Sequence, residues 1–147
     1  MKRDLPYESI ILFMKQTLSQ LIVDAIWHQL ATSPPVFMTP DKAKGKPFTI
    51  TDVSEDRVSV KHGKVQHISK ESFRRTIEYL IANNCVSVPT ACDIRASKSG
   101  GGPLDIASRV PQNNKADMVI PYVLPILAHL GIVSIKPTRR NAAWLNL

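Results

Sequence analysis

The chain has 147 residues, 44% of them hydrophobic, which suits one compact domain or two very small ones that share a core. Nineteen Lys and Arg residues against twelve Asp and Glu residues give a formal net charge of +7 and a pI near 9.7. This excess favours nucleic acid or another acidic partner, the alternative being that the charge only keeps the protein soluble.

Charged and polar side chains interrupt the apolar residues near the N-terminus. Asp4, Glu8 and Lys15 break the run that a cleaved leader would need, and no small-residue cleavage site follows. Lys15, Asp24 and His28 are among too many polar groups for an uninterrupted membrane span of about 20 residues. We therefore expect a cytoplasmic protein with no membrane partner.

Residues 7–31 contain neither Gly nor Pro and predict one long helix. A helix with apolar residues over so much of its circumference must bury more than one face, inside the core or against a second copy. The apolar positions of the helix are Ile10, Ile11, Phe13, Met14, Leu18, Leu21, Ile22, Val23, Ala25 and Ile26. We expect a homodimer through residues 7–31.

Residues 32–46, with three prolines and three lysines, predict a basic linker.

From Phe48 the apolar period changes to two, which predicts strands with turns at residues 54–56 and 62–64. Val58 and Val60 belong to the second strand, and residues 65–68 form a third. Ser69 is expected to cap a helix that ends near Asn83, with Asn83-Asn84 as a left-handed stop. The buried residues of that helix are predicted to be Phe73, Ile77, Leu80 and Ile81.

The remaining residues predict three helices and a hairpin. A short helix is expected around residues 90–96, and a second begins at Pro103 and runs to Val110. The third begins near Pro121 and ends at Gly131. Residues 132–136 and 142–147 then form a hairpin with a basic tip.

This order of helices followed by a hairpin resembles the winged-helix DNA-binding fold over residues 71–147. The resemblance rests on residues 124–135, where an apolar helix runs through Leu-Gly into a strand. It implies that the turn before the third helix enters a DNA groove and that the hairpin contacts the backbone or the minor groove. The implied turn residues are Gln112, Asn113, Asn114 and Lys115, and the implied hairpin residues are Lys136, Thr138, Arg139, Arg140 and Asn141.

The predicted fold class is α+β, with a long N-terminal helix, a small antiparallel β element and a C-terminal winged-helix-like unit. Residues 1–46 hold the helix and the basic linker, and residues 47–147 hold the rest, with one shared core. A second basic set would widen the DNA footprint unless nearby acidic residues neutralise it as exposed ion pairs. This set is Arg57, Lys61, Lys64, Lys70, Arg74 and Arg75, and the acidic residues are Glu55, Asp56, Glu71 and Glu78.

No catalytic or metal-binding pattern is evident in the sequence. The histidines are scattered without metal-ligand spacing, and the carboxylates lack the nearby lysine of a metal-dependent nuclease. Cys85 and Cys92 match no paired-thiolate motif, so both are expected to be reduced. We predict non-enzymatic binding of double-stranded DNA without a cofactor or metal, as in a transcriptional regulator or an accessory protein. The alternatives are a protein-interaction module that acts through residues 7–31 and an accessory domain of a restriction-type nuclease.

Overall fold

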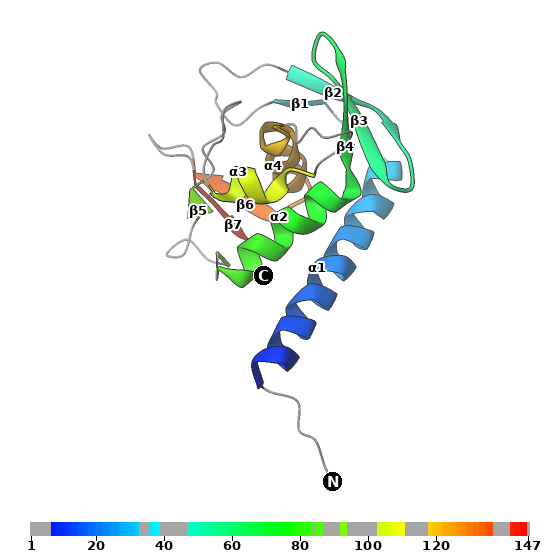
Figure 1. Ribbon diagram of the computed structural model, residues 1–147. Coiled ribbons are helices and arrows are strands. Elements are labelled where there is room, and N and C mark those ends of the chain that lie inside the picture. Colours follow the sequence, from blue (N-terminus) through cyan, green and yellow to red (C-terminus); the bar gives the residue numbers. More distant parts are fainter. Residues whose placement is uncertain are drawn as a thin grey trace.

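The computed structural model describes residues 7–32, 36–38, 47–83, 85–86, 92–93, 103–110, 118–136 and 142–146 (Figure 1). The helices are α1 (Tyr7–Thr32), α2 (Lys70–Ala82), α3 (Pro103–Ser108) and α4 (Ile120–His129). The strands are β1 (Val36–Met38), β2 (Pro47–Val53), β3 (Arg57–Lys61), β4 (Val65–Ser69), β5 (Cys92–Asp93), β6 (Val133–Lys136) and β7 (Ala142–Leu145). This mixture confirms the predicted α+β class.

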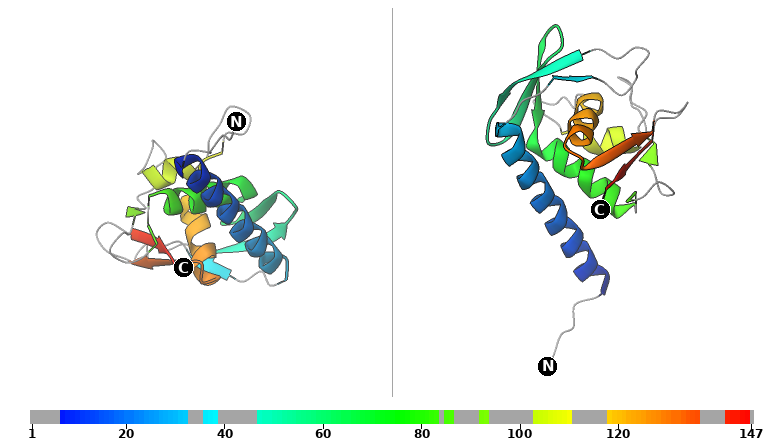
Figure 2. Two further views of the ribbon diagram at one scale, coloured as in Figure 1. Left: turned by 90° about the horizontal axis from the view of Figure 1, so that it is seen from below. Right: turned by 180° about the vertical axis from the view of Figure 1, so that it is seen from behind.

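Two antiparallel sheets flank α4. The first has four strands in the order β1-β2-β3-β4, and the second has three in the order β5-β7-β6. Helix α4 contacts β1 on one side and β6 on the other, while α1 packs along α2 (Figures 1 and 2). The middle of the molecule is therefore a helix between sheets, and α2 separates it from α1.

One hydrophobic core joins both predicted halves of the chain. Val23, Ile26 and Leu30 of α1 are buried in the same cluster as Phe48 of β2 and Leu145 of β7. The spacing of three and four residues along α1 places its three side chains on one face. Described residues from both ranges, 1–46 and 47–147, therefore contribute to the same buried cluster.

Helix α2 forms where the sequence predicts it. The Ser69 hydroxyl accepts a hydrogen bond from the Glu71 backbone N–H at 3.1 Å, which satisfies one of the free donors at the helix start. The four predicted core residues are all buried. The predicted left-handed stop is wrong at Asn83, whose φ is −100°. Its backbone N–H and its side-chain amide both donate to the Tyr79 carbonyl instead.

Three other expectations are corrected by long-range contacts. Strand β1 lies within the predicted linker and pairs with β2. Strand β5 lies where a short helix was expected and pairs with β7. Each is too short to show a period of its own, so only its partner stabilises it. Cys85 is disulfide-bonded, so the prediction that both thiols are reduced is wrong.

Helix α1 extends beyond the rest of the described protein at its N-terminal end (Figure 1). Large apolar side chains remain exposed there, from Ile10 to Leu21. By length and composition, residues Glu8–Ala31 meet the criteria for a helix that crosses a membrane, criteria that partly buried core helices and leaders also meet. The C-terminal half of α1 is anchored in the core, and its N-terminal half is the part that lacks a covering layer.

Candidate nucleic-acid interface

The helix that follows the predicted groove-entering turn is largely buried inside the protein. Ile120, Val123, Leu124, Ile126 and Leu127 of α4 are at most 1% exposed. Their apolar side chains fill the space between the two sheets, which explains why this stretch has such a continuous apolar sequence. Helices α2, α3 and α4 precede the β6–β7 hairpin in the chain, but most side chains of α4 are buried and therefore not available to read base edges.

The start of α4 is fastened to the β3–β4 hairpin by a polar and aromatic cluster. The Gln66 side-chain amide donates to the Met118 carbonyl at 3.2 Å, and the imidazole Nε2 of His62 lies 3.2 Å from the Gln66 side-chain oxygen. The His62 ring stacks on Tyr122 at 4.8 Å, and Phe48 meets Tyr122 edge-on at 5.2 Å. Burial raises the pKa of the Tyr122 phenol. The tip of this hairpin and the entry to α4 therefore move as one unit.

The positive charge of the protein is unevenly distributed along the chain. The described residues contain nine Lys or Arg and nine Asp or Glu residues, so they are neutral in sum. The whole chain has nineteen and twelve, which leaves ten basic and three acidic residues in the other segments. The entire net charge of +7 thus belongs to those segments. They include the predicted DNA-contacting residues Lys115, Arg139 and Arg140.

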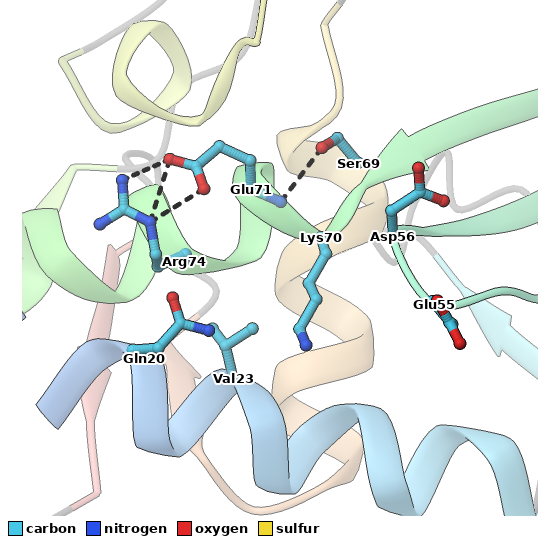
Figure 3. A pocket seen from close by; sticks show the side chains of 8 residues that line it. All are labelled: Gln20, Val23, Glu55, Asp56, Ser69, Lys70, Glu71 and Arg74. Atoms are coloured by element: carbon cyan, nitrogen blue, oxygen red, sulfur yellow. Dashed lines mark hydrogen bonds and ion pairs between the residues drawn. The ribbon is translucent and has the colours of Figure 1, made fainter. Parts of the chain in front are cut away.

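The α2 members of the second basic set are ion-paired. Arg74 contacts Glu71 and Glu78, and Arg75 lies 3.5 Å from Glu71 and donates to the Arg109 carbonyl at 3.3 Å. The hydrogen bond from Arg74 lowers the pKa of Glu71. In Figure 3 the Arg74 guanidinium points toward the Glu71 carboxylate. These two arginines contribute little free positive charge.

Lys70 is neutralised in the same way, across two elements. Its ammonium group lies 2.8 Å from the Asp24 carboxylate of α1 and 5.7 Å from the centre of the Trp27 ring. The hydrogen bond from Lys70 lowers the pKa of Asp24. Lys70 therefore fastens α2 to α1.

The hairpin members of the set are exposed and have no partner in the described part of the chain. Arg57 and Lys61 lie at the two ends of β3, and Lys64 lies in the following turn. Alternation along β3 places Arg57 and Lys61 on the outer face, while Val58 and Val60 point into the core. The acidic residues at positions 52, 55 and 56 lie near the Arg57 end. The Lys61–Lys64 end is therefore the positive end of this sheet.

The residues implied by the winged-helix resemblance lie almost entirely outside the described residues. This applies to the turn residues 112–115 and to residues 138–141 of the hairpin. Lys136 is the last residue of β6, opposite Ala142 in the register.

A serine–histidine pair on the outer face of the sheet was not predicted from the sequence. The Ser59 hydroxyl lies 2.7 Å from Nδ1 of His67, because the β3–β4 register places the two residues opposite each other. The alternation of the two strands was visible in the sequence, but their register was not. Within the described residues no carboxylate contacts His67, and Ser59 is 4% exposed. We interpret the pair as a cross-strand hydrogen bond that stabilises the hairpin.

Two adjoining cavities, of about 220 and 430 Å³, lie between α1, the β2–β3 turn and the start of α2. Their walls carry Glu55, Lys70 and Arg74 (Figure 3), and the two cations are already held by Asp24, Glu71 and Glu78. Among the described residues no group of three or more His, Cys, Asp or Glu side chains is arranged to hold a metal ion. The cavities therefore lack a set of free groups that would hold a charged ligand.

Comparison with known proteins gives no match to a family model, to a curated protein or to a solved structure.

Proposed function

We propose that the protein binds double-stranded DNA without catalysing a reaction, and that the tip of the β3–β4 hairpin with the entry to α4 forms the main contact. The observation that carries this proposal is the position of the unpaired cations. Three of the Lys and Arg side chains that have no ion-pair partner in the described part of the chain, Arg57, Lys61 and Lys64, share this hairpin, whereas Lys15 lies on α1.

Unpaired lysines are suited to phosphate contacts because they release condensed counterions on binding without first breaking an ion pair. Arg57 and Lys61 are four residues apart on one strand, which corresponds to about 13 Å. That length matches roughly four base pairs of duplex at 3.4 Å each. A two-stranded ribbon of this kind is one of the shapes that proteins lay along a DNA groove.

We propose fewer DNA-contacting elements in the C-terminal part than the winged-helix resemblance implies. The helices α2, α3 and α4 precede the β6–β7 hairpin in the expected order, which supports a related arrangement. Because α4 is buried, any base contacts would come from residues 112–115 before it. Residues 137–141, between β6 and β7, would supply a second set of phosphate contacts.

A salt titration tests the proposal. Binding to a labelled random-sequence duplex, measured by fluorescence anisotropy, should weaken linearly in a plot of log K against log salt concentration. The double variant Lys61→Ala/Lys64→Ala should lower the magnitude of the slope by about 1.8, at about 0.9 for each phosphate contact. Lys15→Ala is the matched control, since it removes an unpaired lysine from α1 and should leave the slope unchanged.

Two outcomes would contradict the proposal. Absence of binding at low salt would exclude DNA as the ligand, and equal slopes for the hairpin variant and the wild type would exclude the hairpin as the contact. The variant Arg139→Ala/Arg140→Ala tests the second contact set separately, and an unchanged slope there would remove the β6–β7 hairpin from the interface.

A further inference from the structure

The exposed side of α1 carries a continuous apolar stripe on the side opposite to the core. Its residues follow the spacing i, i+4, i+8, i+11 and i+15, which keeps them within an arc of about 80° on a helix of 3.6 residues per turn. The core-facing residues Val23, Ile26 and Leu30 lie on roughly the opposite side. The outer stripe consists of Ile10, Met14, Leu18, Leu21 and Ala25.

The outer stripe exposes an unusual amount of apolar surface. Leu21 is 61% exposed and Met14 59%, and Ile10 and Leu18 are exposed by more than a third. Side chains of this size, left about half exposed, present on the order of 100 Å² each. Two copies of the stripe would then bury about 800 Å² of apolar surface. With the polar flanks added, the total approaches the roughly 1,000 Å² of a specific interface.

A second copy of the chain fits this surface better than a lipid bilayer does. The C-terminal half of α1 is packed against α2 and contributes to the core, so a membrane-spanning α1 would have to abandon that packing. The Lys70–Asp24 ion pair also holds the helix on the protein. Polar side chains border one side of the stripe at Thr17 and Asp24, as they border the apolar seam of a paired helix.

The stripe is complementary to itself when two helices run in opposite directions. Antiparallel pairing centred between Thr17 and Leu18 places Ile10 opposite Ala25 and Met14 opposite Leu21. A large residue then meets a small one at each end, which allows close packing. Antiparallel helices also place opposite ends of their dipoles side by side.

We propose that the protein is a homodimer in which the outer stripes of two α1 helices pack antiparallel, centred between Thr17 and Leu18. This interface is independent of the proposed DNA contact, which lies on the β3–β4 hairpin. In such a dimer the two hairpins are related by a twofold axis. Palindromic sites are the DNA sequences that match this symmetry.

Sedimentation velocity across a wide range of protein concentration tests the dimer. The wild type should sediment as a dimer that dissociates on dilution, and Leu21→Glu should sediment as a monomer under all conditions. Leu12→Glu is the matched control. Leu12 lies five turns before Leu30, on the core-facing side, yet is 54% exposed because α1 there extends beyond the described body (Figure 1). This variant introduces the same charge off the stripe and should remain a dimer.

Circular dichroism should show both variants folded, since both side chains are exposed in the monomer. A wild type that is monomeric at every concentration would overturn the proposal, as would equal dissociation of the two variants. A monomer that co-sediments with anionic phospholipid vesicles through Leu21 would assign the stripe to a membrane surface instead.

Disulfide trapping tests the direction of the helices. An equimolar mixture of the Ile10→Cys and Ala25→Cys variants should form a mixed cross-linked dimer on mild oxidation. Ile10→Cys alone should not cross-link, because antiparallel packing separates the two copies of residue 10 by most of the helix. Efficient cross-linking of Ile10→Cys alone would contradict the antiparallel arrangement.

Discussion

The buried ion pair of α3 provides a sharp test of the packing. The Asp105 carboxylate is fully buried and accepts two hydrogen bonds from the Arg109 guanidinium, at 3.0 and 2.9 Å. Arg109→Met removes the cation and leaves a carboxylate in the interior. Breaking a buried pair in this way costs about 3 to 5 kcal/mol. Because Asp105 is in the first turn of α3, where the helix dipole favours a negative charge, we expect the lower end, about 3 kcal/mol.

Urea unfolding monitored by circular dichroism measures this loss, and the melting temperature should fall by roughly 10 °C. The double variant Asp105→Leu/Arg109→Met is the control. It removes both charges, and replacing a whole buried pair by apolar residues is often close to neutral. The double variant should therefore be more stable than Arg109→Met alone. The reasoning is refuted if the double variant is less stable than the single one.

Three further predictions concern stability. Trp27→Phe removes the hydrogen bond from the indole N–H to the Ser54 carbonyl at 2.7 Å while an aromatic ring still faces Phe73. It should cost about 1 to 2 kcal/mol in urea unfolding, and wild-type stability would show that this bond contributes nothing. The lowered pKa of Glu71 adds stability that is present above its ordinary pKa and is lost as the pH falls through its folded value. Melting temperatures of Glu71→Gln should therefore depend less on pH between about 5 and 3, and an unchanged pH profile would contradict this. Dithiothreitol should lower the melting temperature of the wild type by breaking the disulfide at Cys85, typically a loss of about 2 to 4 kcal/mol, but should not affect Cys85→Ser.

The disulfide also bears on where the protein acts. Disulfides persist mainly in oxidising compartments, so the redox state of Cys85 in cells bears on the cytoplasmic location expected from the sequence, which remains a prediction.

Local patterns in the sequence were sufficient for the elements that carry their own start and stop signals. The absence of Gly and Pro predicted α1, the Ser69 cap predicted α2, and the change of period to two predicted β2, β3 and β4. Each of these signals depends on residues close together in the sequence. It can therefore be recognised without knowing which element packs against it. The β6–β7 hairpin was also predicted from a local signal. Gly131, whose φ is +78°, lies between the end of α4 and the start of β6.

Only the tertiary structure decided which charges are free and which apolar faces are covered. Lys70 and Arg75 looked equivalent to Lys61 in the sequence, but Lys70 contacts Asp24 on α1 and Arg75 contacts the Arg109 carbonyl just after α3. In the same way, α4 had the sequence of an apolar helix whether or not a sheet covered it. The physical reason is that an ion pair or a buried face depends on residues distant in the sequence. The local spacing of apolar and charged residues does not indicate which of those distant residues will be in contact.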